Sequence, residues 1–145
     1  MALDVLFITP GNAKKVYQGL ATKYSAIEPP TWSLLLAQSC RSKGFSVEIL
    51  DALAENCGHE EIISRINSKS PRLLCFVVYG QNVNAGTASM AGATQLADSI
   101  KASGVTLPIA FVGSYVQALP HHALRDEPSI DIVFTNEGVY ALHNL

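Results

Sequence analysis

The hydrophobic residues of this chain gather in five short runs, which are separated by longer stretches with a different spacing. The run at residues 73–79 is apolar without alternation, which is typical of a strand covered on both faces in a parallel sheet. The run at residues 45–50 alternates apolar and polar side chains, which indicates a strand closer to the edge of a sheet. The pattern predicts five strands, at residues 3–9, 45–50, 73–79, 107–112 and 130–135.

Between these runs, apolar residues recur at intervals of three and four, the spacing of one face of a helix. The first helix is expected to open after Pro29 and Pro30 and to end at Gly44, because proline suits the start of a helix and glycine its end. Its buried stripe is predicted to be Trp32, Leu35, Leu36, Ser39 and Cys40. Further helices are predicted around residues 59–66, at about residues 86–103, in a short segment from residue 120, and at the start of residues 137–145.

Strands that alternate with helices from one end of the chain to the other predict a doubly wound, five-stranded parallel α/β sheet. The length of 145 residues suits one such domain, which we expect to span residues 1–145. We expect the flavodoxin-like strand order 2-1-3-4-5, with residues 73–79 central and residues 45–50 at one edge. The order 3-2-1-4-5 needs the same elements and is the alternative.

Composition and charge narrow the classes of partner. Hydrophobic residues make up 48% and charged residues 15% of the chain, and the net charge is −2. This is unlike the basic surface that nucleic acids require, and no apolar run reaches the ~20 residues of a membrane span. The acidic start of the chain is unlike a signal peptide, so we expect a cytoplasmic protein. Three well-separated cysteines predict buried, unreactive thiols rather than disulfides or a metal knuckle.

In a sheet of this kind, ligands bind where the carboxyl ends of the strands meet, at the point where the winding reverses. Four loops therefore carry the candidate residues, which combine glycines that allow close backbone approach with amide, hydroxyl and carboxylate side chains. The predicted binding residues are Gly11, Asn12, Gly80, Gln81, Asn82, Gly113, Ser114, Tyr115, Glu137 and Gly138. Two of these loops also have a structural interpretation, in which Asn84 and Glu137 cap the helices that follow.

The sequence offers no catalytic constellation. The first loop has neither the glycine spacing of a dinucleotide-binding fingerprint nor that of a nucleoside triphosphate loop. His121 and His122 are adjacent, so they do not face one point on a helix, and we expect them at the surface. No serine elbow and no cysteine–histidine pair provides a nucleophile. We therefore expect a binding domain without metal ligands and without catalytic activity of its own.

Four segments of the sequence, taken in order, resemble one family. Residues 28–37, EPPTWSLLLA, and residues 43–52, KGFSVEILDA, are similar to its paired prolines, its Leu-Ala pair and its later spacing of Gly, Val and Asp. Residues 112–120, VGSYVQALP, resemble its GG-x-H-x-x-x-x-P, and residues 130–138, IDIVFTNEG, resemble its D-x-V-x-x-GEGE. The family is the cobalamin-binding N-terminal domain of radical S-adenosylmethionine enzymes.

The resemblance implies cobalamin as the cofactor, bound without a protein histidine on cobalt. It also implies a parent enzyme whose downstream radical domain holds a [4Fe-4S] cluster and S-adenosylmethionine and performs methyl transfer or related radical chemistry. The cluster motif C-x-x-x-C-x-x-C is absent from this sequence, so the chain resembles a truncated accessory domain. Its implied partners are cobalamin and the downstream radical domain.

The sequence departs from the family pattern at four positions. Val112 replaces the first glycine of GG, Tyr115 replaces the histidine, and Asn136 and Val139 replace the outer residues of GEGE. We expect weak or absent cobalamin binding by this chain alone, because the radical domain that should cover one face of the corrin is missing from it. The branched side chain of Val112 is also expected to narrow the pocket. The alternative is a cofactor-free structural or docking domain of the same fold.

Overall fold

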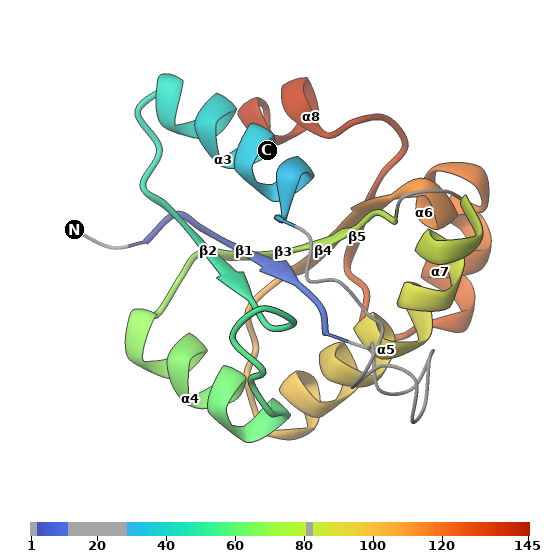
Figure 1. Cartoon of the computed structure of the whole chain (residues 1–145), viewed down its shortest axis with the longest axis horizontal. Coiled ribbons are helices and arrows are strands. Elements are labelled where there is room, and N and C mark those ends of the chain that lie inside the picture. The colour runs from blue at the N-terminus through green and yellow to red at the C-terminus, as the bar shows by residue number, and fades with distance from the viewer. Residues whose placement is uncertain (1–2, 12–28, 81–82) are drawn as a thin grey trace.

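A five-stranded parallel sheet forms the middle layer of the described part of the molecule (Figure 1). The computed structural model describes residues 3–11, 29–80 and 83–145, with the backbone alone at residues 83 and 84. The strand order β2-β1-β3-β4-β5 confirms the prediction, with β3 central and β2 at an edge, and the alternative order is wrong. The strands are β1 (Val5–Thr9), β2 (Val47–Asp51), β3 (Leu73–Val78), β4 (Ile109–Gly113) and β5 (Ile132–Phe134).

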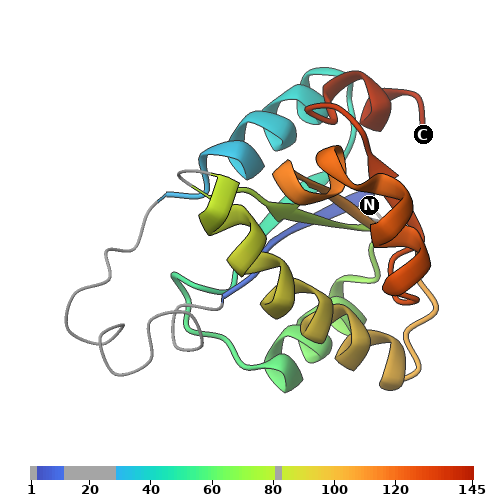
Figure 2. The same cartoon turned by 90° about the vertical axis from the view of Figure 1, so that its right-hand side faces the viewer.

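Helices cover both faces of this sheet. They are α3 (Thr31–Ser42), α4 (His59–Lys69), α5 (Val83–Ala102), α6 (Ser114–Ala118), α7 (Pro120–Asp126) and α8 (Val139–His143). Figures 1 and 2 both place α3 and α8 on one side of the sheet and α4 and α5 on the other. The short helices α6 and α7 share the core of α4 and α5, so the fold is doubly wound and flavodoxin-like. Among the described residues, none of the helices combines the length and the apolar character that crossing a membrane requires.

Side chains alternate along each strand and so divide the interior into two hydrophobic cores. In β3, Leu74 and Phe76 belong to the core under α4 and α5, whereas Leu73 and Cys75 belong to the core under α3 and α8. All six residues of β3 are buried, which explains why this run shows no polar alternation in the sequence. Phe76 also stacks on Phe111 of β4, with ring centroids 4.7 Å apart, and this contact joins the two central strands.

The buried face of α3 differs from the predicted stripe. Trp32 is 40% exposed and Leu35 is 55% exposed, so the prediction was wrong for both residues. The residues that face the sheet are Ser33, Leu36, Ala37 and Cys40. Ser33 tolerates burial because its hydroxyl bonds that of Thr9 in β1, at 2.8 Å, which removes the cost of burying an unpaired polar group. The helix is therefore rotated so that Leu36 and three small side chains approach the sheet, while Trp32, Leu34 and Leu35 are exposed.

The predicted strand boundaries lie within two residues of the observed ones. Gly44 follows the end of α3 as predicted, with a φ of +90° that favours glycine. α5 begins at Val83, so Asn84 lies within its first turn and does not cap it. The sequence analysis placed Gly113, Ser114 and Tyr115 in a loop, and this is wrong, because Gly113 closes β4 and α6 starts at the next residue.

The rotation of α3 predicts opposite outcomes for two adjacent leucines. Leu36 is 1% exposed and Leu35 is 55% exposed. Leu36→Ala should lower the free energy of unfolding by about 2–5 kcal/mol, because it leaves a cavity in the core. Leu35→Ala should change it by less than about 0.5 kcal/mol. Urea denaturation followed by circular dichroism measures both, and equal losses for the two variants would contradict the observed rotation.

Candidate functional site

A cavity of about 270 Å³ opens at the carboxyl ends of β1 and β3. From β1 the chain runs to α3 on one face of the sheet, and from β3 it runs to α5 on the other. The cavity therefore lies at the point where the winding reverses, which is the ligand position that the sequence predicts for this fold. Its described lining is Thr9, Pro10, Pro29, Pro30, Thr31, Trp32, Ser33, Leu53, Val77, Tyr79, Gly80 and Ser89. We call it the carboxyl-edge pocket.

One wall of the carboxyl-edge pocket is a stacked aromatic pair. Trp32 of α3 and Tyr79, directly after β3, have ring centroids 4.5 Å apart and planes 22° apart. The Tyr79 hydroxyl accepts a hydrogen bond from Gln117 Nε2 at 2.6 Å, and the same nitrogen donates to the Asn136 carbonyl at 2.9 Å. The stack is thus connected to α6 and to the segment before α8. Burial raises the pKa of Tyr79, so its phenol stays neutral near pH 7.

The polar part of the pocket consists of hydroxyl groups. The Thr9 and Ser33 hydroxyls bond one another, and Ser89 of α5 lies on the other side. No charged side chain is among the described residues that line the pocket. Such a lining holds a neutral or apolar group by ring contacts and hydrogen bonds, and it supplies neither a nucleophile nor a general base.

The structure brings only part of the predicted set of binding residues to this pocket. Gly80 lines the pocket. Gly11 lies beside Leu53, another lining residue, since a Cβ on Gly11 would stand 3.1 Å from the backbone of Ala52 and Leu53. Asn12, Gln81 and Asn82 lie outside the described residues. The remaining five predicted residues are not among its described lining: Gly113, Ser114, Tyr115, Glu137 and Gly138.

Two glycines near β4 lie close against other parts of the protein, Gly113 against backbone and Gly86 against a side chain. A Cβ on Gly113 would lie 2.1 Å from the Val78 carbonyl oxygen, and one on Gly86 would lie 2.4 Å from Ser114 Oγ. Ser114 Oγ is itself buried, and it has no hydrogen-bond partner among the described residues. These residues let β3, β4, α5 and α6 approach closely, so packing is sufficient to explain them.

The other predicted positions near β5 also have structural surroundings. Tyr115 packs against the core under α4 and α5. Glu137 is exposed and does not cap α8, whose N-cap is Gly138; the Gly138 N–H bonds Asn136 Oδ1 at 2.8 Å instead. Val112 is fully buried beneath Gly138. Val112 is not among the described residues that line the carboxyl-edge pocket, and its expected narrowing of a cobalamin pocket stays a prediction.

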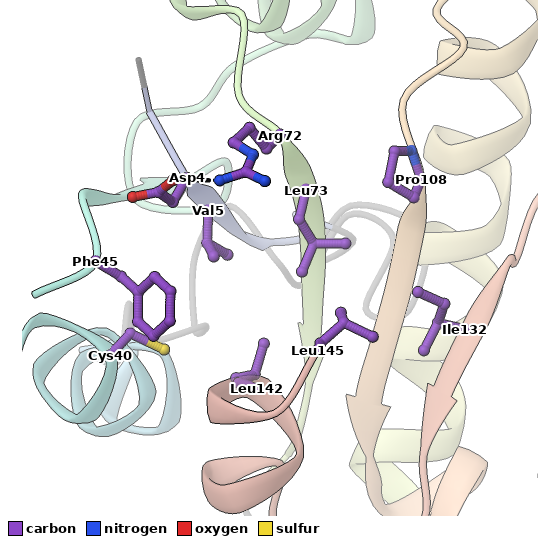
Figure 3. Close-up of a pocket in the computed structure, with 10 residues that line it drawn as sticks. All are labelled: Asp4, Val5, Cys40, Phe45, Arg72, Leu73, Pro108, Ile132, Leu142 and Leu145. Carbon is purple, nitrogen blue, oxygen red and sulfur yellow. Dashed lines mark hydrogen bonds and ion pairs between the residues drawn. The ribbon is translucent and has the colours of Figure 1, made fainter. Parts of the chain in front are cut away.

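Two further hollows lie elsewhere on the described surface. Figure 3 shows one at the amino edge of the sheet, again about 270 Å³, where apolar side chains such as Leu73 and Leu142 meet beside an Asp4–Arg72 ion pair of 3.3 Å. A wider hollow of about 710 Å³ lies between α3 and α8. Neither occupies a reversal of winding, so we take the carboxyl-edge pocket as the candidate site.

Histidines and cysteines do not form a metal site in the described part of the chain. His121 and His122 are exposed, as predicted, and none of the four histidines is among the described residues that line the carboxyl-edge pocket. Cys40 and Cys75 are buried and Cys57 is half-buried, and burial raises the pKa of all three thiols. The predicted burial is therefore confirmed for Cys40 and Cys75, and the low reactivity of the thiols stays a prediction.

Comparison with known protein families identifies the family to which this chain belongs. A family model described as "B12 binding domain" matches residues 17–145. The chain belongs to the B12-binding domain family. The match covers α3 through α8 and so includes both helices that flank the pocket. No curated protein sequence matches this B12-binding domain significantly.

Solved structures resemble this B12-binding domain in fold. One is the radical S-adenosylmethionine methyltransferase TsrM from Kitasatospora setae with cobalamin and a [4Fe-4S] cluster bound, at a TM-score of 0.62 and 16% identity. It covers 88% of this chain and 21% of TsrM. TsrM with its tryptophan substrate and an S-adenosylmethionine analogue matches at a TM-score of 0.55 and 16% identity, over 80% and 20% of the two chains. The chain thus spans about a fifth of the length of these structures.

Sequence reasoning missed the aromatic wall of the B12-binding domain's pocket. It placed Trp32 on the buried stripe of α3 and treated Tyr79 as part of a strand. The positions of the two residues in the sequence could have revealed the wall. Tyr79 is the last residue of the predicted central strand, and Trp32 lies at the start of the helix that follows the first strand. Both therefore stand at the carboxyl edge, where large aromatic side chains can form a ligand wall.

The close approach at Gly113 gives a testable prediction. Gly113→Ala should lower the free energy of unfolding by about 1–3 kcal/mol, because the added methyl group would overlap the Val78 carbonyl oxygen. Gly58→Ala is the matched control, since a Cβ there meets nothing within 4 Å, and it should cost less than about 1 kcal/mol. Thermal or urea unfolding measures both losses, and a Gly113→Ala variant as stable as the control would refute the packing role.

Proposed function

We propose that this chain binds cobalamin over the carboxyl ends of β1 and β3, as the cobalamin-binding part of a larger radical S-adenosylmethionine enzyme. The observation that carries the proposal is the match of residues 17–145 to the B12-binding domain family in a chain whose pocket lies at the reversal of winding. The fold likeness to the cobalamin-bound methyltransferase TsrM supports the kind of parent enzyme.

The size and lining of the pocket suit part of cobalamin. A volume of about 270 Å³ is just below the ~300–1,000 Å³ of sites that enclose a drug-sized ligand, and cobalamin is larger than such ligands. One limb of the cofactor would therefore enter the pocket, and the rest would stay outside it. The Trp32–Tyr79 wall fits a planar group, and the hydroxyls of Thr9, Ser33 and Ser89 fit polar substituents.

In the proposed function, the residues of this chain bind and orient the cofactor. When bound, cobalamin supplies methyl-transfer or related radical chemistry. The hydroxyls and the neutral Tyr79 phenol offer hydrogen bonds, and the prolines before α3 shape the rim. The absence of histidine from the described pocket lining supports cobalamin bound without a protein imidazole on cobalt. The described lining holds no proton-transfer pair, so we expect no turnover from this chain alone.

The structural match to TsrM supports a proposal for the rest of the enzyme. The chain covers 21% of TsrM, whose structure holds a [4Fe-4S] cluster. We propose that the cluster and S-adenosylmethionine belong to a separate radical domain that covers the exposed side of the cofactor. The three free cysteines, none of them paired, suit the cytoplasm, where we propose the protein works.

A docking domain without cofactor is the second candidate. The observation in its favour is the outward-facing apolar surface of α3, where Leu34 and Leu35 are 51% and 55% exposed. Exposed apolar side chains of this kind often mark contact with another domain or protein. Cobalamin titration separates the two candidates, because a docking domain has no reason to bind the cofactor.

Titration of hydroxocobalamin into the purified chain tests the proposed function. We expect a weak, saturable change in the visible spectrum with one cobalamin per chain, because only one limb is enclosed. Ser89→Phe should abolish the change, since it fills the pocket. Ala91→Phe is the matched control, since it places the same ring on an exposed position of α5. Absence of binding by the unmodified chain, and by a longer protein that includes a radical domain, would favour the docking domain.

A further inference from the structure

We propose that Trp32 is the specificity-determining residue of the carboxyl-edge pocket, and that it stacks on a flat conjugated ring of the ligand. The inference rests on the proposed function, since cobalamin supplies the rings. It concerns a residue that none of the family motifs quoted above specifies, because Trp32 stands at an unspecified position between the paired prolines and the Leu-Ala pair. Trp32 acts on binding and takes no part in a chemical step.

The placement of Trp32 is unusual for its size. Tryptophan brings a large apolar area, and burying that area is favourable. Yet Trp32 remains 40% exposed at a pocket, while the neighbouring Ser33, a small polar residue, is 1% exposed. The fold thus buries a hydroxyl and leaves the indole at the pocket wall. A flat ligand stacked on the indole would bury the part of its apolar surface that is exposed here.

The indole is held in place before any ligand arrives. Tyr79 stacks on Trp32 at 4.5 Å, and the Gln117 amide donates to the Tyr79 hydroxyl at 2.6 Å. Gln117 Nε2 also donates to the Asn136 carbonyl at 2.9 Å, so both of its hydrogens are engaged. The Thr9–Ser33 bond anchors the first turn of α3 to β1. A contact surface held this way loses little conformational entropy when it binds.

The lining around Trp32 selects for a ring rather than for a charge. No described lining residue carries a charge, and the neighbours of the stack are prolines, Leu53, Val77 and hydroxyl side chains. Recognition therefore depends on the area and planarity of the group that stacks. Cobalamin offers two such groups, the corrin and the nucleotide base, and the shared chemistry is a flat conjugated ring.

Cobalamin titrations of single variants test the role of Trp32. Trp32→Ala should weaken hydroxocobalamin binding by about tenfold, the usual effect of removing one ring stack. Trp32→Phe should retain affinity within about threefold, because a smaller ring remains. Gln117→Ala should weaken binding by a smaller factor, since the stack stays but its brace is lost. Leu35→Ala is the matched control, an exposed apolar residue of the same helix outside the described pocket lining, and should bind as the unmodified chain does.

Titration with cobinamide, which lacks the nucleotide base, shows which ring of cobalamin stacks on Trp32. A tenfold loss for Trp32→Ala with both compounds assigns the contact to the corrin, and a loss with hydroxocobalamin alone assigns it to the base; either outcome supports the proposal. Equal binding by Trp32→Ala and the unmodified chain overturns it and leaves cobalamin binding standing. Failure of the unmodified chain to bind overturns the proposed function, and the role of Trp32 with it.

A measurement on the unmodified chain tests the same proposal without depending on whether the variants fold. Trp32 is the only tryptophan, so the protein has one side-chain indole N–H resonance. Saturation with diamagnetic hydroxocobalamin should shift this resonance, because a stacked ring changes its magnetic environment. An unshifted indole resonance in a saturated sample would overturn the proposal without any substitution.

Discussion

β1 and β3 lie side by side in the sheet, but the chain leaves them in opposite directions. After β1 it reaches α3 on one face, and after β3 it reaches α5 on the other. Crossovers of parallel strands are right-handed, so this order of strands compels the two connections to part. Between the described parts of the two connections lies a hollow, and the carboxyl-edge pocket occupies it. The candidate site is thus a consequence of topology before any particular side chain is considered.

Side chains then turn that hollow into a binding surface. The burial of Leu36 and the bond between Thr9 and Ser33 both favour the observed rotation of α3, which brings Trp32 to the pocket wall instead of the core. Tyr79 and Gln117 extend the wall toward α6 and the segment before α8. Residues far apart in the sequence therefore depend on one another at the site, although each belongs to a different element.

Much of the fold could be predicted because its causes are local. The apolar run of β3 marks a strand buried on both faces, and alternation in β2 marks an edge, which together favour the observed order. The face of α3 could not be predicted in the same way. Residues 34–37 are all apolar, so the pattern permits two stripes one residue apart. The contacts that distinguish them, the packing of Leu36 in the core and the Thr9–Ser33 bond, join separate elements and exist only in the folded chain.

The carboxyl-edge pocket lies at the edge of the sheet where the sequence predicts a ligand, and it contains only part of the predicted set of residues. The rule for parallel sheets located the edge, and Gly80 lies in the pocket. Glycines also serve close packing, and the sequence does not distinguish the two uses. Gly113 closes against the Val78 carbonyl, a contact between two strands that only the folded chain contains. Hydroxyl and aromatic residues were missed because they were assigned to strands and a helix core.

Nuclear magnetic resonance with cob(II)alamin tests most directly whether cobalamin binds at the carboxyl edge. Its unpaired electron broadens the resonances of nearby protons, so it marks the bound position on the isotope-labelled chain under anaerobic conditions. We expect the Trp32 indole and the Gly80 and Leu53 amides to broaden, and Arg72 and Leu145 at the amino-edge cavity to stay sharp. Broadening centred on Arg72 and Leu145, with sharp Trp32 and Gly80 resonances, would contradict a cobalamin site at the carboxyl ends of β1 and β3.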